Sequence, residues 1–367
     1  MLKTRSQISS APSAPSIDPL ASEVVEVDDD PVAFLELSLR SEWGDGLPMV
    51  PPTEERVRAM LAGTPYHADD VVAELPPGRR EATVELAAIN AVMAGCEPAG
   101  LPLVIAALEA IATPEFNAFG ITTTTSGTHP MLIVNGPSRD RLGIDYGPGC
   151  MGGAAGRGSM TIGRAVSLCL RNVGGQRVGK NSKSVFGQPA RTGLCFAEWE
   201  ERSPWPSLAC QLGFGADEDV VTVHAGKGTF PMADTNNDDA LDLLYLVAKT
   251  TAFPLSNKYL TPSASNGQMV LAFNPLWAER FGRVFPDIVE LQGYLFEHAW
   301  QPIDLWPAAN QAVLEANGRV DEKGRVRLCA RPDQFVVIVC GGLGGLHAVC
   351  LPSWGDSEMA SRAAVHA

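Results

Sequence analysis

A dense run of glycines is the strongest chemical signal in the sequence. Residues 147–158 read GPGCMGGAAGRG, with six glycines in twelve positions, and lead into an amphipathic stretch predicted to be helical over 161–170. Glycine loses the most backbone freedom on folding, so such a cluster often serves close approach to the backbone. Backbone N–H groups at a helix N-terminus can bind an anion. The substrate-binding residues expected here are Cys150, Gly152, Gly153, Arg157, Ser159, Thr161 and Arg164.

The run is not a nucleotide-binding motif. It lacks the lysine of the phosphate-binding GxxxxGK[ST] loop, and it does not follow a clear strand as a dinucleotide fingerprint would. A site for a small carboxylate or other polar group therefore remains open. The alternative is that the glycines only allow tight packing of the helix.

Two cysteines are candidates for thiol chemistry. Cys96 lies between two predicted helices, and a thiol reacts as the thiolate, which helix N-termini and cationic neighbours favour. We therefore expect Cys96 to be the nucleophile, although most isolated cysteines are small buried apolar residues. Cys150 lies inside the glycine run and could face the same cavity.

Two further residues could transfer protons. Glu198 directly follows a predicted strand over 194–197, where a carboxylate is well placed for acid or base catalysis. The alternative is a solvated loop in which Arg202 pairs with a glutamate. His347 follows a predicted strand over 335–339 and a glycine-rich loop, as in a crevice at the ends of strands, although a single histidine is more often structural.

Four other residues are candidate substrate contacts: Asn135, Asn172, Gly341 and Gly342. The amides of Asn135, Asn172 and Asn274 lie in predicted loops and could orient a substrate, but each residue type is also typical of turns.

Composition limits the classes of function. The chain has 367 residues, 45% of them hydrophobic and 19% charged, which is typical of a globular protein with a large core. Its net charge of −14 argues against nucleic acid or an anionic membrane as partner. The sequence contains neither a secretory signal nor an apolar run of about 18 residues, so we expect a cytoplasmic protein, with a homo-oligomeric assembly.

The eight cysteines are widely spaced and form no CxxC pair, which favours reduced thiols over a disulfide framework. Zinc sites need clustered cysteine or histidine residues, and the spacing provides no such cluster. We expect neither a metal nor a cofactor.

Hydrophobic periodicity, caps and turn residues predict alternating helices and strands. The predicted helices cover 31–39, 53–61, 83–94, 101–112, 161–170, 239–248 and 287–299. The predicted strands cover 131–134, 194–197, 220–223, 335–339 and 348–351. These elements predict an α/β fold with mixed sheets and flanking helices.

The expected organisation is a flexible N-terminal arm over 1–42, an α/β catalytic domain over 43–355 and a C-terminal tail over 356–367. The domain could divide into two lobes near 225–265. MLIVNGPSRDRLG (131–143) and MVLAFNPLWAERFG (269–282) each read as a strand, a turn and a helix, so the unit could be duplicated. Chance similarity is the alternative, because such joints commonly use Asn, Gly and Pro.

Several segments together resemble a largely uncharacterised family of bacterial proteins, often found beside small (seleno)proteins with a UGSC motif. Some members of that family carry thiol-disulfide oxidoreductase names. The segments are GDGLPMVPPTEERVRAML, MAGCEPAGLPLVIAALEAI, MLIVNGP, TIGRAVSLCLRNVGG, CFAEWEERSPW, GYLFEHA and GGLGGLHAVCLPSWG, within residues 43–355. The resemblance implies family positions at Cys96, Asn135, Glu198, His347 and the glycines of TIGRA and NVGG.

The chain departs from the family pattern at two places. Leu276-Trp277 replaces a Glu-His pair, and Trp199 replaces an asparagine. If those positions contact substrate, the substrate of this protein is more apolar or aromatic.

These observations predict a small-molecule enzyme in which Cys96 is a nucleophile or redox thiol and Glu198 and His347 move protons. The reaction could be thiol redox chemistry, C–S bond chemistry or a cofactor-free lyase step. Two alternatives stay open: a non-catalytic large subunit that binds a small UGSC-type partner, and a metal- or haem-dependent enzyme.

Overall fold

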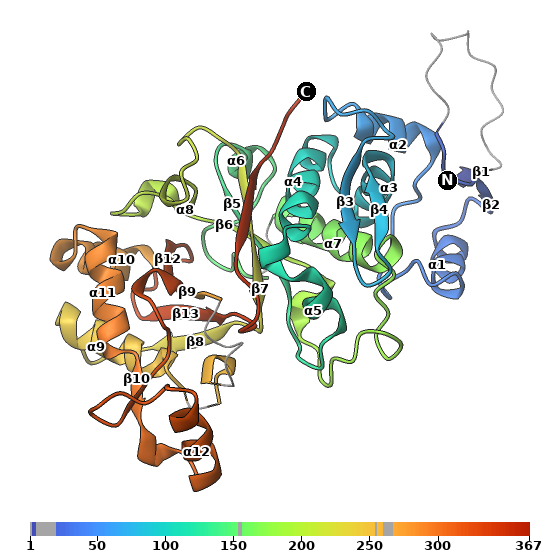
Figure 1. Cartoon of the computed structure of the whole chain (residues 1–367). Helices are drawn as coiled ribbons and strands as arrows, with labels where there is room; N and C mark the ends of the chain where they lie inside the picture. Colours follow the sequence, from blue (N-terminus) through green and yellow to red (C-terminus); the bar gives the residue numbers. More distant parts are fainter. Residues whose placement is uncertain (1, 5–19, 153–155, 254, 260–266) are drawn as a thin grey trace.

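Two four-stranded mixed sheets form the centre of the molecule, and helices cover their outer faces (Figure 1). The computed structural model describes residues 2–4, 20–152, 156–253, 255–259 and 267–367. The first sheet has the order β14-β7-β5-β6 and the second β12-β9-β13-β8. The fold is α/β, with mixed sheets and flanking helices, as the sequence predicts.

The strands of the first sheet are β5 (His129–Asn135), β6 (Leu194–Ala197), β7 (Val220–Gly226) and β14 (Ala360–Ala363). Those of the second are β8 (Phe230–Ala233), β9 (Met269–Phe273), β12 (Phe335–Val339) and β13 (His347–Pro352). In the first sheet, β5 pairs in parallel with β6 and antiparallel with β7. In the second, β9 pairs in parallel with β12 and antiparallel with β13. The two sheets therefore share one arrangement, while duplication of the unit stays a prediction.

One strand returns to the first sheet after the second sheet is complete. β8 follows β7 but pairs with β13, and β14 follows β13 but pairs with β7. The crossing point is an antiparallel bridge between Gly226 and Ser353, flanked by a 2.9 Å hydrogen bond from the Lys227 N–H to the Pro352 carbonyl. The first sheet is therefore complete only when β14, which follows the second sheet in the sequence, pairs with β7.

The two sheets pack face to face. Side chains alternate along a strand, so Met131 and Ile133 of β5 enter the core between the sheets together with Val270 and Ala272 of β9. Leu132 on the opposite face of β5 enters a separate core beneath helices. The resulting order of layers is helices, sheet, sheet, helices (Figure 1).

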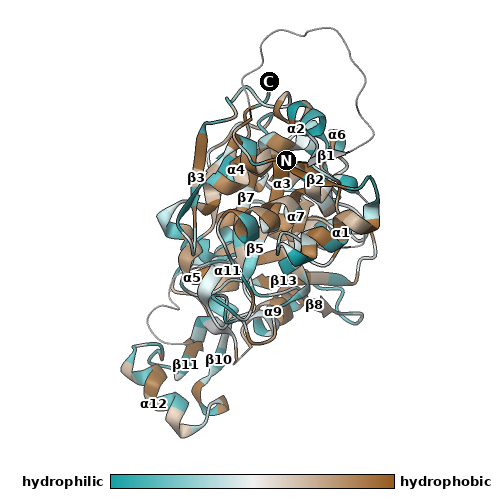
Figure 2. Cartoon of the chain, turned by 90° about the vertical axis from the view of Figure 1, so that its right-hand side faces the viewer, coloured by the Kyte–Doolittle hydropathy of each residue, from teal (hydrophilic) through white to brown (hydrophobic). Residues whose placement is uncertain are grey.

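Helices cover the outer face of each sheet. α4 (Leu101–Ile111) and α7 (Arg157–Asn172) lie on the first, with α3 (Val84–Ala94) packed against both of them, and α9 (Ala240–Thr251), α10 (Pro275–Val284) and α11 (Ile288–His298) lie on the second. α4 is buried along nearly its whole length. Figure 2 shows the corresponding concentration of hydrophobic residues on the central helices and strands.

Local signals explain where helices begin and end. The Thr83 hydroxyl accepts a hydrogen bond from the Leu86 N–H at the start of α3, and Gly95 ends that helix with φ of 88°. The Asn274 side chain accepts from the Leu276 and Trp277 N–H groups at the start of α10. The helices and strands predicted from the sequence are confirmed, with bounds that differ by a few residues.

Smaller elements surround this centre. The remaining α-helices are α1 (Pro31–Arg40), α2 (Glu54–Leu61), α5 (Ala118–Thr123), α6 (Ser138–Arg141), α8 (Leu208–Gln211) and α12 (Ala308–Ala316). The remaining strands are β1 (Leu2–Thr4), β2 (Val25–Val27), β3 (Val71–Leu75), β4 (Arg80–Thr83), β10 (Trp300–Pro302) and β11 (Arg325–Arg327). Part of the predicted arm thus forms β2 and α1, and the segment expected as a tail contains β14.

Candidate functional site

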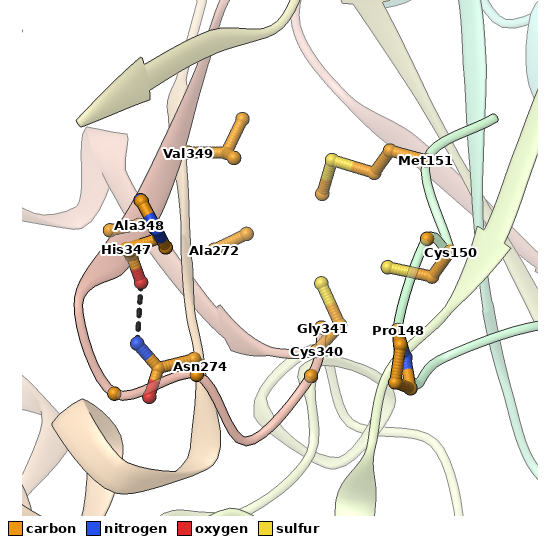
Figure 3. Close-up of a pocket in the computed structure, with 14 residues that line it drawn as sticks. Pro148, Cys150, Met151, Ala272, Asn274, Cys340, Gly341, His347, Ala348 and Val349 are labelled. Carbon is orange, nitrogen blue, oxygen red and sulfur yellow. Dashed lines mark hydrogen bonds between the residues drawn. The ribbon is translucent and has the colours of Figure 1, made fainter. Parts of the chain in front are cut away.

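A cavity of about 440 Å³ opens where the glycine run meets the second sheet (Figure 3). We call it the thiol cavity. Its walls come from the glycine run, from the end of β9, and from the loop and strand that follow β12. The lining residues are Pro148, Gly149, Cys150, Met151, Ala272, Asn274, Cys340, Gly341, Gly342, Gly344, Gly345, His347, Ala348 and Val349. Apart from Asn274 and His347, the lining side chains are apolar or thiols.

Small residues create this space. Gly341 has φ of 93°, a conformation that favours glycine, and a Cβ added there would meet nothing within 4 Å. A Cβ at Gly344 would also meet nothing within 4 Å. Ala272 and Ala348, which also line the cavity, have small side chains that occupy little of its volume. The GGLGG loop therefore brings backbone rather than side chains to the cavity.

Two thiols meet at the wall of the thiol cavity. Cys150 is 5% exposed, Cys340 is 4% exposed, and Figure 3 shows their sulfur atoms directed toward one another. The neighbouring Cys340 thiol and the Gly341 backbone hold the pKa of Cys150 below its ordinary value, despite burial and the nearby Asp145 charge. The neighbouring Cys150 thiol, burial and the Glu198 charge raise the pKa of Cys340. Cys150 is thus the thiol disposed to ionise.

Glu198 lies one position beyond the end of β6, near enough for its charge to act on Cys340, but it lines neither the thiol cavity nor the one adjoining it. Cys340 holds the corresponding position beyond β12: the Glu198 N–H donates to the Val134 carbonyl (3.2 Å), as the Cys340 N–H does to the Phe273 carbonyl (3.1 Å). Parallel pairing with the central strand therefore brings both residues to the same edge of their sheets.

The Glu198 carboxyl group is 1% exposed. Burial, with a contribution from the Glu200 charge, raises its pKa to about 7, although hydrogen bonds from the Leu208 N–H and the Asn135 side chain favour the charged form. Its Oε1 atom has no hydrogen-bond partner within the described ranges. A carboxyl group with such a pKa can exchange a proton near neutral pH.

Arg139 holds the segment that carries Glu198. The Arg139 guanidinium is 4% exposed and donates to the Glu198 carbonyl (2.6 Å) and to the Gly136 carbonyl (2.8 Å). It also pairs with Glu201 at 2.7 Å and Glu200 at 3.4 Å. Asn135 contacts both Glu198 and Glu200 at 2.8 Å, so its amide orients carboxylates and is not placed to contact substrate directly.

His347 lies across the thiol cavity from Cys150 and Met151 (Figure 3). Its backbone carbonyl accepts a hydrogen bond from the Asn274 side chain, which also caps α10. Trp277 donates from its indole N–H to the Gly345 carbonyl, so the residue that departs from the family pattern supports the glycine loop. The imidazole itself is exposed and free to face a bound molecule.

A second, smaller cavity of about 210 Å³ adjoins the first. We call it the polar chamber. It shares Cys150 and Met151 with the thiol cavity, but Cys340 does not line it. Its other lining residues are Met131, Asp145, Gly152, Ser159, Met160, Gln188, Pro189, Ala190, Thr192, Gly193, Leu194, Cys195, Gly228 and Thr229.

The glycine run has two structural roles. Gly149 and Gly152 border the cavities, whereas a Cβ at Gly158 would lie 2.5 Å from the Leu142 carbonyl oxygen. At the start of α7 the Gly156 N–H already donates to the Asp145 carboxylate at 2.5 Å. The expected anion site at this helix N-terminus is therefore occupied by the chain's own carboxylate. Gly153 lies outside the described residues.

Cys96 lies elsewhere. Its side chain belongs to the core beneath α3, α4 and α7, and it is absent from the linings of both cavities. Burial raises the pKa of Cys96 to about 12, although a hydrogen bond with Thr161 opposes this. The structure thus does not bring the expected nucleophile to the cavity that contains Cys150 and His347. The physical reason is that the turn between α3 and α4 packs against the far side of α7.

The remaining expected substrate contacts tie structural elements together. Arg157 donates to the Gly95 carbonyl and pairs with Glu97 at 2.9 Å. Arg164 pairs with Asp45 at 2.7 Å. The Asn172 side chain donates to Asn90, the Thr161 hydroxyl to the Arg157 carbonyl, and the Ser159 hydroxyl accepts from the Asp145 N–H. Of these residues only Ser159 lines a cavity.

Sequence reasoning missed Cys340 as a functional candidate. The available signal was its position directly after a buried strand and before a glycine loop, which is the same position that singled out Glu198. Its partner in space, Cys150, is 190 residues away in the sequence, and no spacing rule connects them.

Comparison with models of known protein families, with curated proteins and with solved structures finds no match to this chain. Membership of the UGSC-associated family stays a prediction. In the described ranges, no group of three or more His, Cys, Asp or Glu side chains is placed to hold a metal ion. No single described helix has the length and apolar character needed to cross a membrane; the segments Pro98–Ile111 and Pro114–Thr123, bent by 76°, pass that test only as a pair.

Proposed function

We propose that this protein is a thiol-dependent oxidoreductase for a small, largely apolar molecule bound in the thiol cavity. The observation that carries the proposal is the convergence of the Cys150 and Cys340 thiols at the wall of the thiol cavity, where their sulfur atoms face one another (Figure 3). One thiol is disposed to ionise and its neighbour stays protonated, which is the arrangement that dithiol exchange needs. The reactive thiol in this proposal is Cys150, whereas the sequence alone predicted Cys96.

A disulfide substrate is reduced in two thiol–disulfide exchange steps. The Cys150 thiolate attacks one substrate sulfur, a mixed disulfide forms, and the first half of the substrate leaves as a thiolate. The Cys340 thiol passes its proton to the Glu198 carboxylate and attacks the Cys150 sulfur, which releases the second half. The two protein thiols lose two electrons and the substrate disulfide gains them.

The substrate class follows from the lining. Met151, Ala272 and Val349 present apolar surface, while His347 and backbone groups of the glycine loop supply the polar contacts. Leu276 and Trp277, which depart from the pattern of the resembled family, do not line this cavity, so the substrate class rests on the lining alone. In this proposal, His347, which lines the cavity, gives a proton to the departing thiolate.

All eight cysteines are free thiols. Free thiols persist in reducing compartments, which supports the cytoplasm as the location.

The test exposes the reduced protein to a small aromatic disulfide. We expect loss of the Cys150 and Cys340 thiols, a disulfide between them by peptide mapping, and release of two small thiols per chain. Cys340→Ala should stop at a mixed disulfide on Cys150 and release one. Cys150→Ala should react slowly at Cys340.

Cys210 provides a matched control. It is the one cysteine that is not buried, so a reaction governed only by exposure would modify Cys210 first. Cys210→Ala should leave the release of two small thiols unchanged. Preferential modification of Cys210, with Cys150 and Cys340 still reduced, would contradict the proposal, and would leave C–S bond chemistry or a lyase step at the same cavity to be tested.

A second candidate function is that of a large subunit that binds a small UGSC-type protein. Exposed apolar side chains favour a protein partner: Phe186 is 99% exposed, Val185 67% and Leu255 93%. Mixing the two purified chains distinguishes the candidates. Activity that requires both chains, and that is lost in Phe186→Ser, would support the subunit function.

A further inference from the structure

Cys150 can be reached from two separate cavities. The thiol cavity contains both Cys150 and Cys340, whereas the polar chamber contains Cys150 without Cys340. A molecule in the polar chamber therefore meets Cys150 away from its partner thiol. The side chains of Cys150 and Met151 form the shared wall between the two spaces.

The two cavities differ in chemistry. The polar chamber is lined by the carboxylate of Asp145, the hydroxyls of Ser159, Thr192 and Thr229, and the amide of Gln188. Among the described residues that line it, Asp145 is the only charged one. Its Oδ2 atom accepts a hydrogen bond from the Gly156 N–H. Its negative charge opposes ionisation of the Cys150 thiol, and both side chains line this chamber. The chamber, at about 210 Å³, has room for a few heavy atoms beyond a sulfur.

We propose that the polar chamber binds a small thiol with a positively charged head group, which regenerates the Cys150–Cys340 dithiol. The assignment of a regenerating role rests on the proposed function. The Asp145 carboxylate binds the cationic head, and the thiolate of the same molecule attacks the Cys150 sulfur of the protein disulfide. Cys340 leaves as a thiolate, and a second small thiol releases the first as a symmetrical disulfide. Two small thiols are thus oxidised for each protein disulfide reduced.

This arrangement separates the two half-reactions. An apolar substrate enters the thiol cavity and a cationic thiol enters the polar chamber, so each reaches the same sulfur atom without displacing the other. The Asp145 charge supplies the selectivity, because a carboxylate attracts a cation and repels an anion of equal size.

The test measures labelling of Cys150 by matched methanethiosulfonates. Each reagent transfers its thio group to the Cys150 thiolate, forms a disulfide and releases methanesulfinate. The full-length Cys340→Ala variant retains the label, since no second thiol displaces it. The probes are the aminoethyl (cationic), sulfonatoethyl (anionic) and benzyl (apolar) reagents, and peptide mapping by mass spectrometry gives the rate at Cys150.

We expect the cationic probe to label Cys150 about tenfold faster than the anionic probe, and Asp145→Asn to bring the two rates within about twofold. Asparagine can keep the hydrogen bond from Gly156. The substitution also changes the ionisation of Cys150, but this affects both probes equally, so the ratio isolates the charge effect. A ratio near one in the parent, or a ratio unchanged by Asp145→Asn, would overturn the inference.

Filling each cavity separately tests the geometry. Thr192→Trp should slow the cationic probe about tenfold and leave the benzyl probe within about twofold, and Val349→Phe should do the reverse. Thr229→Trp replaces Thr192→Trp if that variant does not fold. Equal slowing of all probes by either substitution would show a single shared route and overturn the inference. The proposed function fails by a different result, the absence of a Cys150–Cys340 disulfide in the wild type.

Discussion

Replacing Glu198 with glutamine should remove a specific pH dependence from the stability of this protein. The carboxyl group is buried, and its pKa in the folded state is about 7, against an ordinary value of 4.5. Between these two values the folded protein keeps a proton on Glu198 that the unfolded chain has released. The stability associated with the neutral form is therefore fully present below about pH 4.5 and is lost as the pH rises through about 7.

The magnitude follows from the size of the pKa change. A tenfold change in an equilibrium constant is about 1.4 kcal/mol, so a rise from 4.5 to about 7 corresponds to about 3 kcal/mol. Glutamine keeps the oxygen that accepts from Asn135 and Leu208, and places its amide where Oε1 has no partner among the described residues. The variant should thus preserve the packing while removing the titration.

The assay is urea unfolding of wild type and Glu198→Gln, followed by tryptophan fluorescence and circular dichroism from about pH 4.5 to about pH 8. The free energy of unfolding of the wild type, relative to the variant, should fall by about 3 kcal/mol over this range. Taking the difference between the two proteins cancels titrations that both share.

Glu201→Gln is the matched control. The hydrogen bond from Arg139 holds the pKa of Glu201 below its ordinary value, so its contribution to stability is present above that value and is lost as the pH falls. The wild-type-minus-variant difference in the free energy of unfolding should therefore stay nearly constant from about pH 4.5 to about pH 8, because Glu201 titrates below this range. Parallel pH profiles for wild type and Glu198→Gln would refute the reasoning about Glu198.

Three further predictions concern residues whose environments differ sharply. Gly163→Ala should reduce the free energy of unfolding by about 1–3 kcal/mol, because the new Cβ would lie 2.9 Å from the Leu194 nitrogen, whereas Gly344→Ala should be close to neutral; urea denaturation compares them. Arg139→Met should cost about 3–5 kcal/mol in the same assay, since it leaves buried acceptors and carboxylates uncompensated. Cys96→Ser should leave the rate of Cys150 labelling unchanged. A large decrease in that rate would show that Cys96 contributes to the reactive site.

The sequence carried enough local information for most of the fold. Caps such as Thr83, the terminating Gly95 and the buried run over 335–339 act within a few residues, so they could be interpreted without knowledge of the rest of the chain. What could not be predicted was the return of β14 to the first sheet after the second, because strand pairing depends on contacts between distant segments.

The candidate site, like the fold, was predictable from the sequence only in part. The sequence alone determined that the glycine run, Glu198 and the His347 loop are places where chemistry is feasible, because glycine content and the residue after a strand are local properties. Only the tertiary structure decided that Cys150 meets Cys340, that the Glu198 charge acts on Cys340, and that Cys96 belongs to a core under helices. The physical reason is that a thiol's reactivity depends on burial and on charges and donors from other parts of the chain, which the packing of the two sheets sets.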